Sequence, residues 1–303
     1  MPKLLKYIIY LVLFAVSFLL FLYWMFPYDT LKDRVASAIE DPFGRQIEVS
    51  IGDIEPYYFT GLEITNMKLT SRVDGEAKPL AEFKKVRGRA SLFSLLFGNP
   101  SINFLVDTGK GEMEGNAKQT DEGFKIDVDL DDFDTESIKA LESRLGIKLS
   151  GKISGSVELN IDRARPVRTS GKIDISLDNF KIGASQLTIG EANLPLPDMI
   201  ITKGSGSRVK LVIDKGAVGV DEFKLADGDL QIDMKGKIFL STVLANYRIN
   251  LTGSFKASDK LNEAIPVLFM VEKQRQPDGS YPLTITGRVS EPSIKIGTFT
   301  LPL

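Results

Sequence analysis

The stretch Phe124-Lys125-Ile126-Asp127-Val128-Asp129-Leu130-Asp131 decides the fold of this 303-residue chain, because apolar and charged side chains alternate along it without a break. Successive side chains of an extended strand point to opposite faces of a sheet, so this stretch has one apolar face and one charged face. One covered face and one wet face are typical of antiparallel sheets. The stretch therefore predicts an antiparallel strand.

The same period of two continues along most of the chain after Gly44. Further clear strands place these apolar residues on one face: Ile153, Val157, Leu159 and Ile161; Ile173, Ile175 and Leu177; Val209, Leu211 and Ile213; Tyr247, Ile249 and Leu251; Leu283, Ile285 and Val289. Glycine-rich turns at 108–111 and 203–206 separate such strands. The fold class that follows is mainly β, a curved and largely antiparallel sheet domain with two or three short helices.

Apolar residues at helical spacing interrupt this pattern in three places. A short helix near 30–41 is followed by Pro42, which cannot continue it because proline lacks the backbone donor. We expect further short helices at 135–145 and at 259–272. In the last of these, Leu261 and Phe269 would share one apolar face.

Ten apolar residues in the best-alternating strands form the candidate functional face. They are Phe124, Ile126, Val128, Leu130, Ile173, Ile175, Leu177, Tyr247, Ile249 and Leu251. Alternation alone does not say whether the protein's own side chains fill this face or whether it is an open groove for acyl chains. Because most alternating faces in chains of this size meet another layer of their own protein, we expect a packed core. In such a core Ile249→Asp would bury an unpaired carboxylate, at a large cost in stability.

An apolar run from Tyr7 to Phe26 precedes the sheet, and Ser17 is its only non-aromatic polar residue. Twenty helical residues rise about 30 Å, which is the thickness of the hydrocarbon core of a bilayer. Lys3 and Lys6 precede the run, as expected for an inside N-terminus. The run predicts a single membrane-spanning anchor with its ends at Tyr7 and Phe26.

A cleaved signal peptide is the alternative for this segment, because Ala15-Val16-Ser17 has the small-x-small pattern of a cleavage site. Cleavage there would leave the apolar stretch 18–26 at the start of a water-exposed chain. We therefore favour a retained anchor over residues 1–27, followed by a single β-rich domain over residues 28–303.

Composition excludes several kinds of chemistry. The chain has no His and no Cys, so it has no Ser-His-Asp triad, no cysteine nucleophile, no disulfide and no metal site built on imidazole or thiolate. A net charge of −2, from 38 basic and 40 acidic residues, provides no field for nucleic acid. We expect no catalytic residue, no cofactor and no metal, and we expect that the chain is not an enzyme.

Two motifs with chemical potential are better explained as surface charge. The aspartates of the segment 127–134 resemble a calcium loop, but that loop needs Gly at its sixth position and Glu at its twelfth, where this chain has Asp132 and Ile138. Ser207 and Lys210 have Ser-x-x-Lys spacing, which requires a helix. On a strand an offset of three puts the two side chains on opposite faces.

Two apolar clusters are open to both a structural and a functional interpretation. Tyr57-Tyr58-Phe59 is either an exposed contact patch or, as is more common for aromatic side chains, a buried cluster. The segment Leu92–Phe97 is the most apolar stretch outside the anchor, and it either packs on the sheet or covers a groove or interface.

Four phrases follow one another along nearly the whole chain. They are Phe26-Pro27-Tyr28-Asp29, Gly52-Asp53-Ile54-Glu55-Pro56-Tyr57-Tyr58-Phe59-Thr60-Gly61-Leu62, Ser91-Leu92-Phe93-Ser94-Leu95-Leu96-Phe97-Gly98, and Leu283-Thr284-Ile285-Thr286-Gly287-Arg288-Val289-Ser290-Glu291-Pro292-Ser293-Ile294-Lys295-Ile296-Gly297. In this order they resemble the type II secretion system protein N family, which is itself similar to the N-terminal part of AsmA-like proteins.

The resemblance implies a single-pass protein of the bacterial inner membrane, with its C-terminal domain in the periplasm. It implies a non-catalytic accessory or assembly role in a type II protein secretion system, with other secretion-system proteins as partners. The AsmA-like relatives imply an alternative, a module that binds phospholipid and transfers it between membranes through an apolar groove. The family brings no catalytic residues to this chain.

Overall fold

The computed structural model describes residues 3–25, 30–41, 47–58, 60–73, 76–91, 94, 98–139, 142, 147–162, 164–189, 192–241, 243, 246–264 and 269–301. Within these ranges the side chains of residues 3–5, 8, 15, 19, 22–24, 38, 72, 73, 76, 166, 186–189, 192–196 and 264 are not described.

Strands make up most of the described chain, and the helices are few. The α-helices are α1 (Lys3–Met25), α2 (Leu31–Glu40) and α5 (Asp259–Ala264), and the 3-10 helices are η3 (Thr135–Ser137), η4 (Pro166–Arg168) and η6 (Glu272–Gln274). The strands are β1 (Ile47–Ser50), β2 (Asp53–Tyr57), β3 (Gly61–Val73), β4 (Glu76–Ala90), β5 (Ser101–Asp107), β6 (Glu112–Gln119), β7 (Gly123–Asp134), β8 (Leu149–Asp162), β9 (Ser170–Ile182), β10 (Ser185–Ile189), β11 (Ala192–Leu196), β12 (Met199–Ile200), β13 (Ser207–Asp214), β14 (Ala217–Leu225), β15 (Leu230–Phe239), β16 (Arg248–Ala257), β17 (Tyr281–Arg288), β18 (Glu291–Ile296) and β19 (Phe299–Thr300).

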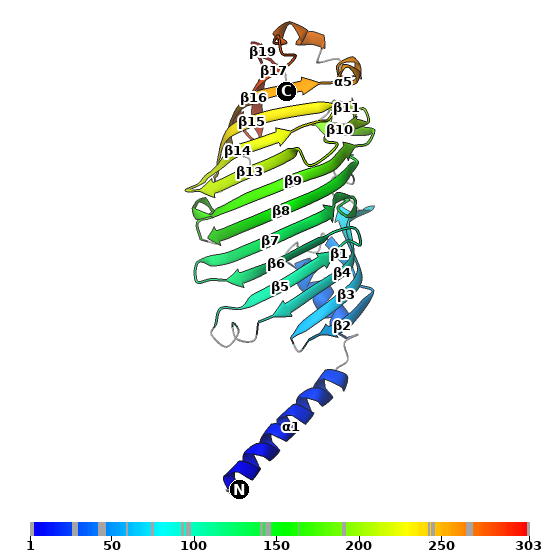
Figure 1. The fold of residues 1–303 in the computed structure, drawn as a ribbon, viewed down its shortest axis with the longest axis vertical. Coiled ribbons are helices and arrows are strands. Elements are labelled where there is room, and N and C mark those ends of the chain that lie inside the picture. The colour runs from blue at the N-terminus through cyan, green and yellow to red at the C-terminus, as the bar shows by residue number, and fades with distance from the viewer. Residues whose placement is uncertain are drawn as a thin grey trace.

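Seventeen of these strands form one sheet in which all paired neighbours run antiparallel (Figure 1). From β3 to β9 each strand pairs with the next one in sequence, and the same holds from β13 to β19. β9 joins the two halves by pairing with β13 and, at its end, with β12. β1 and β2 lie end to end along the free edge of β3. β10 and β11 form a separate hairpin. The mainly β, antiparallel fold expected from the alternation is therefore confirmed.

Helix α1 extends away from the sheet at the β2 end of the molecule (Figure 1). It covers Lys3–Met25, so most of the predicted apolar run is helical, while Phe26 lies outside the described residues. Leu11, Leu13 and Phe14 are exposed on it. Judged on the residues that the structure describes, no helix is long and apolar enough to cross a membrane.

Helix α2 lies where the sequence predicts a short helix near 30–41. Its apolar side contacts a buried cluster made of Val49, Ile54, Ile64 and Met67. Two polar contacts fix it at its ends. The Lys32 ammonium lies 3.4 Å from the Asp53 carboxylate, and the Glu40 carboxylate accepts a hydrogen bond of 2.7 Å from the Val49 N–H. α2 therefore covers the end of the sheet nearest to α1.

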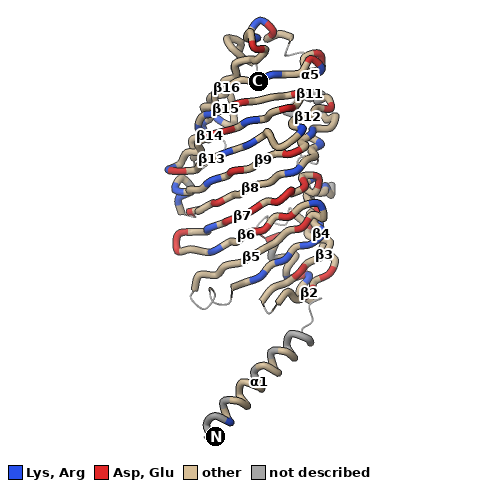
Figure 2. Tube along the Cα trace, in the orientation of Figure 1, with Lys and Arg blue, Asp and Glu red and all other residues tan. Residues whose placement is uncertain are grey.

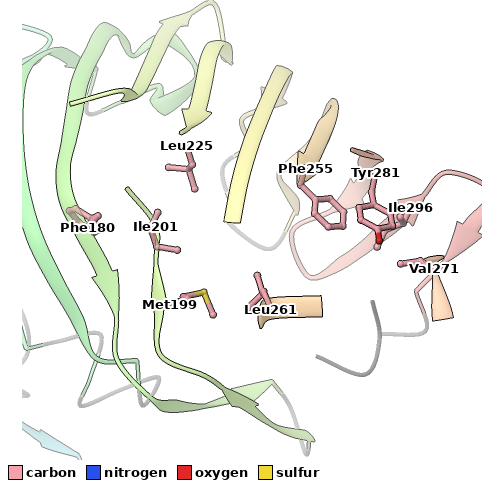
Figure 3. Packing of buried hydrophobic residues seen from close by; sticks show 9 residues of the cluster. All are labelled: Phe180, Met199, Ile201, Leu225, Phe255, Leu261, Val271, Tyr281 and Ile296. Atoms are coloured by element: carbon pink, nitrogen blue, oxygen red, sulfur yellow. The ribbon is translucent and has the colours of Figure 1, made fainter. Parts of the chain in front are cut away.

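A second buried cluster extends from the middle of the sheet to its far end and includes side chains from β9, β12, β14, β16, β17, β18 and α5; we call it the far cluster. Figure 3 shows its members Phe180, Met199, Ile201, Leu225, Phe255, Leu261, Val271, Tyr281 and Ile296. The rings of Phe255 and Tyr281 are stacked with centroids 5.0 Å apart. Leu261 of α5 is 2% exposed, so this short helix closes the far end of the sheet as α2 closes the near end.

Two of the predicted helices lie only partly within the described residues. The segment 135–145 begins with the 3-10 turn η3, Ile138 then forms a β-bridge with Ala81, and Glu142 is helical. The Asp134 carboxylate accepts from the Glu136 N–H, and the Ser137 hydroxyl donates to the Asp134 carbonyl, so local side-chain bonds close a tight turn there. In the segment 259–272, α5 ends at Ala264, Phe269 and Met270 are again helical, and residues 265–268 lie outside the described chain.

Candidate binding face

One face of the sheet carries an unbroken row of uncharged side chains that crosses its strands. We call this the central row, and the pairing registers place one of its residues on each of the strands β5–β9 and β13–β18. In order across the sheet it consists of Phe104, Gly115, Val128, Val157, Ile173, Leu211, Val220, Gly236, Leu251, Ile285 and Ile294. With strands about 4.8 Å apart, ten steps between eleven strands span about 48 Å.

Two flanking rows run parallel to the central row and also contain no charged residue. One consists of Ile102, Ala117, Ile126, Leu159, Gly171, Ile213, Val218, Ile238, Ile249 and Gly287. The other consists of Val106, Met113, Leu130, Gly155, Ile175, Val209, Phe223, Met234, Gly253, Leu283 and Ile296. The three rows together are called the apolar face.

The side chains of the central row are only partly covered. Val220, at 6% exposed, is its one buried member, and the other ten residues of the row are half-buried. One buried cluster lies where α2 contacts β1 and β2, and the other extends along one side of the sheet from Phe180 on β9 to Ile296 on β18. Among the described helices, α2 and α5 contact β1, β2 and β16, and the short helices η3 and η4 contact β8. The face is therefore a half-open apolar surface that a buried cluster borders from β9 to β18.

All ten candidate residues chosen from the sequence are half-buried, and none belongs to a buried cluster. Seven of them fall within the three rows, namely Ile126, Val128, Leu130, Ile173, Ile175, Ile249 and Leu251. Phe124 and Leu177 lie on the same strands just beyond the rows, and Leu177 contacts the far cluster. Tyr247 precedes β16, where its carbonyl accepts a hydrogen bond from the Val289 N–H.

The ten side chains are half-buried, and the expectation of a self-filled core remains a prediction. It assumed a second layer, as is usual for alternating strands. In the described chain, α2 contacts β1 and β2, α5 contacts β16, and the short helices η3 and η4 contact β8. Alternation correctly identified which side chains share a face, but what covers that face is a tertiary property with no local signal.

Two glycines of the apolar face allow neighbouring strands to approach closely. Gly155 has φ +140° and Gly236 has φ +148°, which is a conformation that other residues rarely adopt. A Cβ atom at either position would lie 2.1 Å from the carbonyl oxygen of the adjacent strand, Asp174 or Asn250. Such glycines let a sheet bend without side-chain clashes.

The residues that alternate with the three rows point to the opposite face of the sheet, and many of them are charged. Figure 2 shows basic and acidic residues interspersed along the strands. The Arg208 guanidinium donates two hydrogen bonds of 2.7 Å to the Asp174 carboxylate and holds the pKa of that carboxyl below its usual value. Arg87 donates to Glu63 at 2.6 Å and lowers the pKa of Glu63 in the same way. Cross-strand pairs of this kind account for much of the charge on this face.

A cavity of about 490 Å³ lies on the charged face next to β2. Arg87 lies 4.9 Å from the ring centroid of Tyr57, and Arg89 lies 5.5 Å from that of Tyr58. Tyr58 is 60% exposed, so the expectation that this aromatic cluster is buried does not hold for Tyr58. Cation–π contacts of this kind leave a polar, aromatic surface near α1.

The two motifs interpreted as surface charge have ordinary surroundings. Ser207 is fully buried and its hydroxyl accepts from the Ala226 N–H, whereas Lys210 lies on the charged face beside Asp174. Asp132 pairs with Lys152 at 2.6 Å, and this ion pair lowers the pKa of Asp132. No group of three acidic residues in the described chain is arranged to hold a metal ion. Of the segment Leu92–Phe97, only Ser94 is described.

The fold and the face together define a protein with one N-terminal helix and an open antiparallel meander that is apolar on one side and charged on the other. No family model, curated protein or solved structure matches the chain.

Proposed function

We propose that this protein binds the acyl chains of membrane lipids on its apolar face and carries them along the sheet, away from the bilayer that holds α1. The observation behind this proposal is the uncharged, half-open central row, which continues over eleven strands. A contiguous apolar surface of this extent is uncommon on a soluble monomer and marks an interaction site.

The energetics suit carriage of a lipid better than storage. Each buried CH₂ group contributes about 0.8 kcal/mol, so a chain of about sixteen carbons with half its surface covered gains on the order of 6 kcal/mol relative to water. Full immersion in a bilayer covers such a chain on all sides, so the face does not trap lipid. Because the rows are uniformly apolar, a chain moving from one strand to the next exchanges equivalent contacts.

The membrane anchor is part of the proposal. The run Tyr7–Phe26 carries no charge, α1 covers 23 residues, and helix geometry gives that number a length of about 35 Å. α1 emerges beside β2, at one end of the apolar face (Figure 1). Lipid leaving the bilayer would meet α2 and the strands β1–β4 before it reaches β5, where the central row begins.

A place in a type II secretion system is the second proposal, and it depends on the sequence phrases described above. The exposed Tyr58 and the neighbouring Arg89 support it, because tyrosine and arginine are enriched in protein interfaces. The two proposals use opposite faces of the sheet, so the same protein could hold a lipid on one face and a protein on the other.

Site-specific photo-crosslinking in the full-length membrane protein tests the lipid proposal. A photoreactive residue at Val157, Ile173 or Leu251 should form adducts with phospholipid. The matched controls are residues directly adjacent to these in sequence, namely Glu158, Lys172 and Thr252. They point to the charged face and are exposed. Equal labelling of both sets, or adducts with a second copy of the chain in place of lipid, would refute the proposal.

A further inference from the structure

Two adjacent apolar side chains, Phe269 and Met270, extend into solvent from the segment between α5 and β17. Phe269 is 83% exposed and Met270 is 60% exposed. Phe269 is the most exposed large hydrophobic residue in the described part of the chain. The sequence pattern places Phe269 at helical spacing from Leu261, and Phe269 is helical, but it is exposed whereas Leu261 is buried. Exposure on this scale next to a well-packed cluster needs an explanation.

The segment that carries this pair is held firmly by the residues that follow it. Val271 is fully buried in the far cluster, one residue after Met270 (Figure 3). Tyr281, also fully buried, donates a hydrogen bond of 2.6 Å from its hydroxyl to the Glu272 carboxylate. Gln274 accepts from both the N–H and the hydroxyl of Thr298. Phe269 and Met270 are therefore directly followed by a segment that is packed and hydrogen-bonded to the sheet.

The pair lies at the end of the molecule opposite to α1. In Figure 1 the orange-brown segment that connects α5 to β17 forms the end furthest from the N-terminus. The last strands of the apolar face, β16–β18, lead to the same end. Ala264–Val271 contains no charged residue and is bounded by Glu263 and Glu272.

We propose that Phe269 and Met270 insert into the interface of a second lipid bilayer, so that the protein holds one membrane through α1 and touches another with its far end. The inference names the acceptor of the proposed lipid carriage and rests on that function for its purpose. A bilayer fits better than a protein partner. A stable protein interface buries about 800 Å² on each side, far more than two side chains supply, whereas shallow membrane insertion needs only a small apolar tip.

The test uses the full-length chain reconstituted through α1 into donor vesicles of phosphatidylethanolamine and phosphatidylglycerol. Fluorescent, protein-free acceptor vesicles of the same lipids are added, and their capture by the donors is measured. The double variant Phe269→Ser, Met270→Ser should capture at least about tenfold fewer acceptors, because each large side chain moved out of the interface weakens binding by about that factor. Tyr58→Ser is the matched control, since Tyr58 is also 60% exposed but directly follows β2, the strand nearest to α1.

Unchanged capture by the double variant overturns the proposal, and so does an equal loss with Tyr58→Ser. Capture that requires protein in both vesicle populations overturns it as well, because it would show contact between two copies of the chain. Failure of the lipid proposal is recognised separately. A chain that gives no lipid adducts at Val157 but still captures acceptors would retain the membrane contact without the carriage.

Discussion

Replacing Ile249 with Asp tests whether the apolar face is open. Ile249 lies in a flanking row on β16 and is half-buried. Complete burial of an isoleucine contributes about 1.5–3 kcal/mol, so removal of a half-buried one loses about 1–1.5 kcal/mol. Aspartate is also a poor strand residue, which adds up to about 1 kcal/mol. The new carboxylate can reach water, so no buried charge is created.

We therefore expect Ile249→Asp to lower the free energy of unfolding by about 2 kcal/mol, which is roughly 4–6 °C in melting temperature for a domain of this size. Phe255→Asp is the matched comparison, because Phe255 lies on the same strand and face but is 7% exposed and stacked on Tyr281. Loss of a buried phenylalanine costs about 3–5 kcal/mol before the cost of the trapped carboxylate is added. This variant should melt more than about 10 °C below wild type or fail to fold.

Thermal melting followed by circular dichroism distinguishes the two outcomes. If Ile249→Asp is as damaging as Phe255→Asp, the side chains of the apolar face are packed against another layer, and the reasoning from half-burial is wrong. A small loss at Ile249 together with a large loss at Phe255 would confirm that the face is half-open.

Three further predictions concern other parts of the molecule. Glu63→Gln should reduce stability by about 1 kcal/mol, as expected for a partly exposed ion pair, because Glu63 loses its pairs with Arg87 and Lys85. The pKa of Glu63 is lowered in the folded state, so this difference from wild type should be present at neutral pH and disappear in denaturant titrations as the pH falls through the lowered value. Gly155→Ala should destabilise the protein by more than about 1 kcal/mol, because its φ is +140° and the added Cβ would meet the Asp174 carbonyl, while Gly204→Ala, which has open space around it, should be neutral in the same melting assay. Leu13→Arg should cost about 3 kcal/mol of membrane insertion in a translocon assay, and recovery of a soluble mature chain beginning at Phe18 from the native host would contradict a retained anchor.

The sequence predicts the strands of the middle of the sheet well, because the period of two is a local property. Phe124–Asp131 alternates without a break and lies within β7, and the segment near 30–41 contains α2. The pattern fails where hydrogen bonds from polar side chains compete with the helix. Near 135, the Asp134 and Ser137 side chains close a 3-10 turn in place of the first turn of the expected helix.

The candidate site, like the fold, could be predicted only in part from the sequence. The alternation of side chains along each strand predicts which residues share the apolar face. The structure places seven of the ten chosen residues in three adjacent rows. Their half-burial depends on where α2 and α5 pack, and the alternation within a strand carries no information about that packing. The exposure of Phe269 has no local signal either, because its helical spacing from Leu261 would equally fit a buried side chain.

The order of the strands also determines how the chain can fold. Nearly every strand pairs with its neighbour in sequence, so most strand pairings are hairpins that join adjacent segments of the chain. Local contacts close short loops at low entropic cost and favour fast folding. Each hairpin can then add to the growing edge in the order of synthesis, before the C-terminal strands exist. In this respect the sheet behaves as a one-dimensional array, whose stability is a sum of the interaction energies between neighbouring strands. A destabilising substitution in one strand therefore affects mainly the strands that pair with it.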